Sequence, residues 1–158
     1  KLDEGQYHAI VLAAAGLDRL GLSARIRQRF EPSQMLPAAG QGALGVEVRA
    51  DRHDVMAALA PLAHQPSWMR TMAERAVSRA MGGSCSMPLD AYDTLDDGQL
   101  CLQAAWGDPE GALPLVQVQG QALAHDLPSA NALGEQVAAQ LRHSVLAQGG
   151  TLPLADHV

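Results

Sequence analysis

The sequence predicts an α+β domain over residues 65–158, within a chain of the broader α/β class. Apolar residues recur at helical spacing from Trp68 to Met81. They then alternate with polar residues in three short stretches, and return to helical spacing from Ala130 to Val145. Because each stretch has one apolar face, a three-stranded antiparallel sheet with helices on one face would bury all of them.

The first helix of this domain has clear ends. Pro66 suits a first helical turn, and Gly82 and Gly83 are expected to stop the helix. Arg70 and Glu74 fall on other faces, one turn apart, where an ion pair between them is expected. The positions that repeat at helical spacing and predict the buried face are Trp68, Met69, Met72, Ala73, Ala76, Val77, Ala80 and Met81.

Three strands are predicted between the two helices. The first surrounds Leu89, where apolar residues occupy every second position. The Asp-Asp-Gly turn at 96–98 is typical of a hairpin and leads into a second strand over 100–106. Glycines between 107 and 111 then turn the chain into a third strand over 115–120. The final helix is expected to bury Ala130, Leu133, Val137, Ala138, Leu141 and Val145.

The first part of the chain also shows helical patterns. Residues 6–15 predict a mostly buried helix that Gly16 stops. Apolar residues at every fourth position from 22 to 30, with arginines between them, predict a short amphipathic helix that ends at Pro32.

A glycine-rich loop, a strand and a helix are expected next. Residues 36–45 read LPAAGQGALG, a composition that indicates a loop where the backbone approaches another group closely. Residues 43–49 predict a strand, and Asp51 is expected to cap a following helix. A domain boundary is predicted at 61–66. The inner side of the helix would be Val55, Met56 and Leu59.

Composition excludes several classes of protein. The chain has 158 residues, of which 47% are hydrophobic and 3% aromatic, and its net charge is −6. That charge argues against a nucleic-acid partner, and no apolar run reaches the roughly 20 residues needed to span a membrane. No export signal is recognisable, and the start at Lys1 indicates a portion of a longer polypeptide.

The two cysteines do not form a known metal or disulfide pattern. Cys85 and Cys101 are sixteen positions apart, with no CxxC and no histidine pair nearby, so no metal site is expected. At this density, reduced thiols in a cytoplasmic protein are the simpler interpretation, and for Cys101 it is the one adopted.

The charge is unevenly distributed along the chain. Residues 1–81 hold ten basic and eight acidic residues (10 − 8 = +2), whereas residues 82–158 hold one basic and nine acidic residues (1 − 9 = −8). Nine arginines lie between Arg19 and Arg79. Arginine suits bidentate recognition of carboxylates or phosphates, although a solvated helix face is an equally good explanation for any single one.

Cys85 lies in a glycine-rich loop that leaves its sulfur accessible. It follows a helix C-terminus, whose partial negative charge would raise the pKa of a thiol rather than lower it. No histidine lies within twenty residues on either side, so a thiol-dependent hydrolase lacks a local base. Spacing alone therefore favours an unreactive structural thiol.

Three motifs nevertheless resemble the hydroxymethylbilane synthase (porphobilinogen deaminase) family, and they occur in that family's order. Residues 74–89, ERAVSRAMGGSCSMPL, resemble its cofactor-attachment signature: a Glu-Arg pair, a glycine-rich loop, the cysteine and a proline three residues later. Residues 13–21, AAAGLDRLG, and 36–47, LPAAGQGALGVE, resemble two further family segments. The resemblance covers essentially the whole chain, most closely residues 1–89, and identifies it as a C-terminal half.

The resemblance implies an enzyme of tetrapyrrole biosynthesis. This family of transferases condenses four porphobilinogen molecules head to tail, releases ammonia each time, and hydrolyses off the linear product hydroxymethylbilane. A covalent dipyrromethane cofactor primes the reaction. The resemblance makes Cys85 the residue that carries this cofactor through a thioether, with Ser84, Gln41 and Gly42 beside it.

Substrate-binding residues carry over by motif as well. Arg19 is implied as a clamp for pyrrole carboxylates, and Gly16 as a place where backbone meets them. The family's catalytic aspartate belongs to the N-terminal half, so no catalytic residue is expected in this chain. The arginines left without a role are Arg25, Arg27, Arg29, Arg75 and Arg79, for which solvated or ion-paired positions are expected.

The family fold has three α/β domains, the first two similar to periplasmic binding proteins with a cleft between them. Residues 1–40 would complete domain 2, residues 41–62 would return to domain 1, and residues 65–158 would form domain 3, which carries the cofactor. The N-terminal half of the same enzyme, porphobilinogen and the growing polypyrrole are the implied partners. The whole enzyme is expected to be a cytoplasmic monomer that binds neither membrane nor nucleic acid.

One alternative explains part of the same sequence. A non-catalytic binding module for an anionic ligand, of the solute-binding-protein type, would account equally well for the arginines and for the GQG loop. It gives no reason for a cysteine in a glycine-rich loop.

Overall fold

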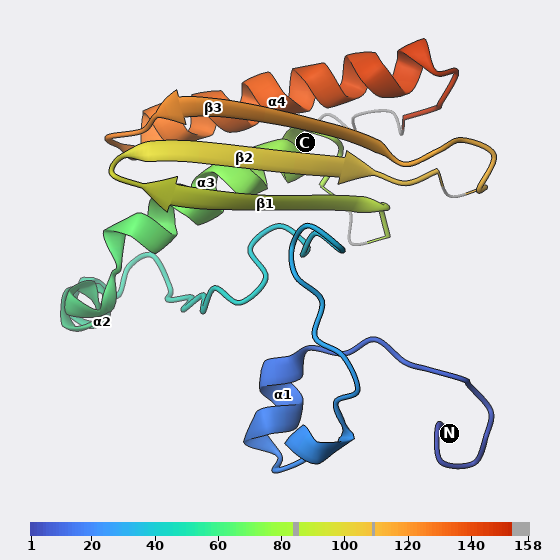
Figure 1. Cartoon of the computed structure of the whole chain (residues 1–158). Helices are drawn as coiled ribbons and strands as arrows, with labels where there is room; N and C mark the ends of the chain where they lie inside the picture. The colour runs from blue at the N-terminus through green and yellow to red at the C-terminus, as the bar shows by residue number, and fades with distance from the viewer. Residues whose placement is uncertain (84–85, 109, 153–158) are drawn as a thin grey trace. The chain divides into compact units, whose positions relative to one another are not determined.

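Three antiparallel strands and two long helices contain almost all of the buried side chains (Figure 1). The computed structural model describes residues 1–83, 86–108 and 110–152. Its contacts divide the chain into two units, Lys1–Met35 and Leu36–Val158. The second unit contains the predicted α+β domain.

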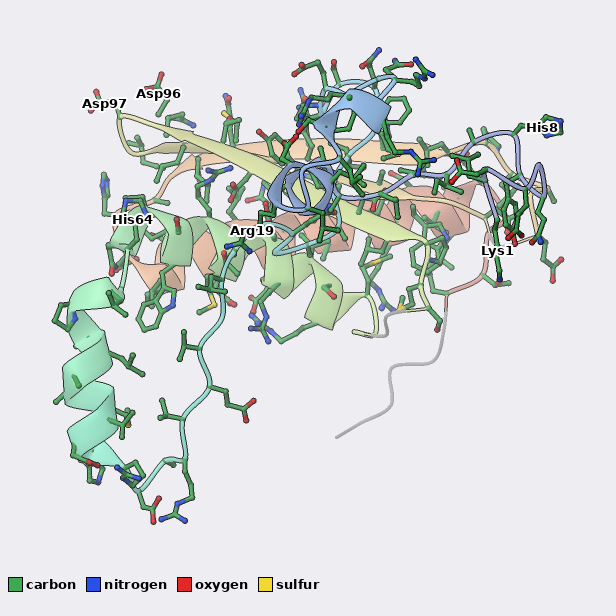
Figure 2. The ribbon with its side chains drawn as sticks, turned by 90° about the horizontal axis from the view of Figure 1, so that it is seen from below. Lys1, His8, Arg19, His64, Asp96 and Asp97 are labelled. Atoms are coloured by element: carbon green, nitrogen blue, oxygen red, sulfur yellow. The ribbon has the colours of Figure 1, made fainter. Side chains whose placement is uncertain are left out.

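The strands form a meander in chain order. β1 (Leu89–Asp96) pairs with β2 (Gln99–Trp106), which pairs with β3 (Val116–Leu123), both pairs being antiparallel. The β1–β2 turn has positive φ angles of 44° at Asp97 and 78° at Gly98, a conformation that aspartate tolerates and glycine favours. Asp97 lies at the tip of this hairpin (Figure 2). The period-two pattern therefore predicted the sheet correctly.

The helices α3 (Gln65–Ala80) and α4 (Leu127–Ala147) cover the same face of this sheet (Figure 1). Every residue predicted for the inner face of the last helix is buried. In α3 the core stripe is correct, but Trp68 is 57% exposed. Its side chain projects about 100° around the helix from that of Met69, which faces the core. The core consists of Met69, Ala73, Val77, Met81, Ala91, Leu100, Leu102, Ala104, Trp106, Val116, Ala124, Ala130, Leu133, Val137, Ala138, Leu141 and Val145.

The two helices pack closely at Gly134. A Cβ atom built there would lie 2.3 Å from the backbone oxygen of Ala73 and 2.5 Å from the Cβ of Ala76. No side chain fits between the helices at this point. Glycine in α4 therefore sets how closely α3 approaches it.

Asp126 caps α4 in a capping box. Its carboxylate accepts a hydrogen bond from the Ser129 backbone N–H at 2.9 Å, and the Ser129 hydroxyl oxygen accepts one from the Asp126 N–H at 3.2 Å. Hydrogen bonds from the Ser129 side chain and backbone hold the pKa of Asp126 below its usual value. The cap therefore depends on an ionised carboxylate.

Asp126→Asn should remove part of the pH dependence of stability. Because the folded-state pKa is lowered, the stabilisation is present above the unfolded pKa and is lost as the pH falls through the folded one, below about pH 4. Urea unfolding of both proteins should be measured between about pH 3 and pH 7, on either side of that pKa. The difference between their free energies of unfolding should become smaller in acid. A constant difference would contradict this assignment.

The first unit departs from its prediction. The helix expected over residues 6–15 is wrong: α1 spans Ala14–Arg19 and runs through Gly16. β-Branched Ile10 and Val11 disfavour a helix before it. The helix α1 ends at Arg19, and the N–H of Leu22 then donates to the carbonyl of Leu17.

Two further predictions in this part of the chain are wrong. The helix expected over 22–30 is reduced to a 3₁₀ turn, η1 (Ser23–Arg25). No residue of Lys1–Met35 is buried, so the amphipathic side of that segment has no apolar surface to pack on within this chain. The strand expected over 43–49 is absent because it pairs with no other strand here, and Leu44 is 93% exposed.

The helix predicted after residue 51 is present. It spans His53–Leu59 as α2 and continues into a 3₁₀ turn, η2 (Ala60–Leu62). Asp51 does not cap it, because its carboxylate pairs with Arg49 at 2.5 Å. The division into 1–40, 41–62 and 65–158 stays a prediction.

Candidate functional site

The loop between α3 and β1 is held at both of its described ends. At the helix end, the N–H of Gly83 donates to the Ser78 carbonyl at 2.8 Å and the N–H of Gly82 to the Arg79 carbonyl at 3.2 Å. This six-to-one pattern requires a positive φ, and the φ of Gly82 is 114°. The predicted helix stop is confirmed.

The strand end of the loop is fixed by a different contact. The N–H of Gly107, just after β2, donates to the carbonyl of Pro88 at 2.8 Å. A Cβ atom built on Gly83, in contrast, would meet no atom within 4 Å, and Gly82 and Gly83 are both exposed. The described flank of the loop is therefore anchored yet open to solvent. Ser84 and Cys85 lie outside the described residues.

The GQG loop packs against α3, within the same unit. The Gln41 side-chain oxygen accepts from the Ala38 N–H at 3.1 Å, and both Gln41 and Gly42 are exposed. Loop and helix together enclose a shallow hollow of about 220 Å³. Its lining is Gly40, Gln41, Gly42, Ala43, Ser67, Arg70, Thr71 and Glu74.

Glu74 joins this loop to the sheet. One carboxylate oxygen accepts from the Gly40 N–H at 2.7 Å, and the other accepts from the Asp93 N–H on β1 at 3.3 Å. Only 7% of Glu74 is exposed, so this side chain is buried although it lies outside the predicted apolar face of the helix. Burial raises its pKa, and the hydrogen bond from Gly40 opposes that effect.

Arg70 pairs with Asp93 rather than with Glu74. Its Nε donates to Asp93 Oδ1 at 2.6 Å, and its Nη2 donates to the Asp93 carbonyl at 2.7 Å. Asp93 is fully buried, which raises its pKa, while the guanidinium of Arg70 acts in the opposite direction. Its second carboxylate oxygen is buried without a hydrogen-bond partner among the described residues. The predicted Arg70–Glu74 pair is thus corrected.

The arginines of the first unit separate into paired and unpaired groups. Arg25 pairs with Asp3, and Arg29 binds Asp18 at 2.9 Å. Arg19, at the end of α1, has no ion pair or hydrogen bond from its side chain within the described part of the chain. The expectation of an ion pair or of a solvated side chain therefore fits Arg25 and Arg29.

The same division holds for two further arginines. Arg79 donates to the Asn131 side chain at 2.7 Å. Arg75 is exposed and, like Arg27, is without a partner in residues 1–83, 86–108 and 110–152. Among the described residues, the side chains of three arginines, Arg19, Arg27 and Arg75, therefore have no hydrogen-bond or ion-pair partner.

The predicted site residues are divided between the two units of the chain. Gly16 and Arg19 belong to the first unit, and Gln41 and Gly42 to the second. Along α3, Met81 lies ten residues beyond Thr71, about 15 Å at the rise of an α-helix. The hollow therefore lies beside the first and middle turns of α3, whereas the loop to β1 begins at the end of that helix.

Sequence reasoning missed Asp93 altogether. Its signal was an aspartate at an inward-facing strand position between Ala91 and Leu95, where only apolar residues are expected. Within the described ranges no group of three metal-binding side chains occurs, and no helix combines the length and apolarity needed to cross a membrane.

Known proteins resemble this chain along nearly its whole length. The family model "Porphobilinogen deaminase, dipyromethane cofactor binding domain" matches residues 1–57, and "Porphobilinogen deaminase, C-terminal domain" matches residues 68–143. The porphobilinogen deaminase of Albidiferax ferrireducens is 67% identical over 156 residues, covering 99% of this chain and 50% of that protein.

Two further relatives agree. The porphobilinogen deaminase of Paraburkholderia phytofirmans is 54% identical over 89% of this chain and 41% of its own length. That of Ralstonia nicotianae is 52% identical over 95% of this chain and 46% of its own length. The chain thus spans about half the length of the curated relatives it matches, and none of them supports the binding-module alternative. It belongs to the porphobilinogen deaminase family.

Proposed function

We propose that this chain is the C-terminal part of a hydroxymethylbilane synthase. The complete enzyme would join four porphobilinogen molecules head to tail. Each step forms a carbon–carbon bond between an aminomethyl carbon and a free pyrrole α-carbon. The carbon–nitrogen bond of the aminomethyl group and the C–H bond of the α-carbon break, and the amino group leaves with that proton as ammonia. Water then frees hydroxymethylbilane. The structural observation that carries the proposal concerns the described flanks of the loop between α3 and β1. Gly82, Gly83 and Pro88 are held by backbone hydrogen bonds, and the space around Gly83 is open. The resemblance places the cofactor between these flanks.

The described residues fit a bulky covalent group at this loop. Cys85 would hold a dipyrromethane through a thioether, with Ser84 beside it and Gln41 and Gly42 as lining residues of the cleft. Such a group supplies a free pyrrole α-carbon to which the first substrate unit is joined. The open space at Gly83 leaves room for it. Cys85 is alkylated only once, so a thiol without an activating base suffices.

The carboxylates of the pyrrole rings require cations from the protein. Arg19 would bind them, with backbone groups at Gly16 nearby, because its guanidinium has no internal partner to give up. Among the described residues, the two buried carboxylates, those of Glu74 and Asp93, are poor proton donors to a substrate. Glu74 is engaged by two backbone N–H groups and Asp93 by Arg70. The proton-transfer group is expected outside this chain, because the resemblance places the catalytic aspartate in the N-terminal half of the enzyme.

The main partner of this chain would be the N-terminal half of the same enzyme. With it, residues 1–40 complete domain 2, residues 41–62 return to domain 1, and residues 65–158 form domain 3. Exposed apolar side chains such as Val11 and Leu44 are then covered. The whole enzyme is a cytoplasmic monomer.

The function is tested by supplying the full-length protein with porphobilinogen. We expect ammonia release together with a linear tetrapyrrole that closes spontaneously to a porphyrinogen. Cys101→Ser should keep this activity, whereas Cys85→Ser should abolish it. Tight binding of porphobilinogen without ammonia release would instead indicate a binding protein and refute the proposal.

A further inference from the structure

Glu74 connects three segments that are far apart in sequence. Its carboxylate accepts one hydrogen bond from Gly40 in the GQG loop and another from Asp93 on β1, while its own backbone belongs to α3. The sequence separations are 34 and 19 residues. A single side chain thus closes the contact between loop, helix and sheet.

The edge of β1 explains why this contact is needed. β1 is an edge strand of the described sheet, so its N–H groups that face away from β2 meet no strand there. The N–H of Ala91 donates to the Pro37 carbonyl at 3.2 Å, and the N–H of Asp93 donates to Glu74. Residues 37–40 therefore lie along this edge and are held there once by backbone and once by a carboxylate.

We propose that Glu74 is a positioning residue that fixes the GQG loop relative to α3, the helix that precedes the cofactor-attachment loop, so that Gln41 meets the growing pyrrole chain at a constant place. This inference rests on the proposed function. The Gly40 bond is short at 2.7 Å, and the carboxylate is almost completely shielded from water. Both conditions strengthen a charge-assisted hydrogen bond. The two backbone donors would each be left unsatisfied if Glu74 were absent.

Arg70 keeps Glu74 available for this role. Arg70 lines the same hollow but directs its Nε and Nη2 to Asp93. Asp93 is thereby held as the ion-pair partner of Arg70, and both carboxylate oxygens of Glu74 remain free to accept from the backbone. The carboxylate of Asp93 thus binds the Arg70 guanidinium, and the carboxylate of Glu74 binds the loop at Gly40.

The test compares Glu74→Ala, Glu74→Asp and Glu74→Gln in the full-length enzyme, with Glu135→Gln as the matched control. Glu135 is an exposed glutamate on α4 whose side chain accepts a hydrogen bond from Asn131, its one partner among the described residues. Aspartate keeps the charge but is one methylene too short to reach both donors. Glutamine keeps the length but only one acceptor oxygen.

Three measurements are needed: intact mass for cofactor loading, steady-state kinetics per loaded enzyme, and amide hydrogen exchange of residues 36–43. For the Ala and Asp variants we expect normal loading, faster exchange of that segment, and a kcat lowered on the order of tenfold to a hundredfold. Glu74→Gln should fall between these variants and the wild type, and Glu135→Gln should match the wild type.

Two results would overturn the inference. One is a loaded Glu74→Asp enzyme with wild-type kcat. The other is faster exchange of residues 36–43 with kinetics per loaded enzyme unchanged, which would make Glu74 structural only. If Glu74→Ala fails to fold, the Asp and Gln variants decide. A wild-type protein that carries no adduct and releases no ammonia would refute the proposed function instead, so the two failures are distinguishable.

Discussion

Gly134→Ala is expected to destabilise the fold by about 2 kcal/mol. The added methyl group would be placed 2.3 Å from the Ala73 backbone oxygen and 2.5 Å from the Ala76 Cβ. Neither atom can move without shifting α3 itself, because one belongs to the backbone and the other is attached directly to it. The gain in helix propensity, up to about 1 kcal/mol, offsets only part of this strain.

Urea unfolding of the chain measures the effect as a lower midpoint at an unchanged slope. Gln136→Ala is the matched control: it adds alanine two residues away, at an exposed position of α4, and should change stability by no more than about 0.5 kcal/mol. A Gly134→Ala protein as stable as the wild type would show that the helices can separate freely at this point.

Arg19→Ala is expected to raise KM for porphobilinogen by roughly tenfold to a hundredfold in the full-length enzyme. A charge-assisted hydrogen bond contributes about 1.5–3 kcal/mol, which corresponds to that range. The melting temperature should stay unchanged, since the Arg19 side chain makes no hydrogen bond or ion pair within the described residues.

Arg27→Ala provides the comparison for this clamp. Arg27 is also exposed and without a partner in the described part of the chain, and it lies only eight residues away, but no family motif assigns it a role. Its replacement should leave KM close to the wild-type value. An equal loss in both variants would mean that overall positive charge, rather than a defined clamp at Arg19, attracts the substrate.

The parts of the fold that were predicted correctly have their packing partners inside this chain. The helices α3 and α4 and the three strands each bury one face against the others, so periodicity alone was sufficient to predict them. The segments at 6–15, 22–30 and 43–49 also carry helix or strand patterns. They do not form the predicted elements because the described part of this chain offers them no complementary surface. Apolar periodicity alone cannot reveal whether such a surface is present.

The polar contacts at the site show a second limit. Spacing on one helix predicted a pair between Arg70 and Glu74, but each has a stronger partner from elsewhere in the sequence, Asp93 for Arg70 and the Gly40 backbone for Glu74. Local spacing contains no information about such distant partners. The family motif at 74–89 includes Glu74, but it was interpreted for its cysteine and not for a contact of this carboxylate.

The proposed function depends most on Cys85. If this residue carries a dipyrromethane, the protein is heavier by the mass of that group than a protein with an unmodified Cys85 thiol. Intact mass of the purified full-length protein, followed by peptide mapping, measures this directly. We expect one dipyrromethane adduct located on Cys85, retained in Cys101→Ser and lost in Cys85→Ser. Fully active enzyme with an unmodified Cys85 thiol would contradict the account.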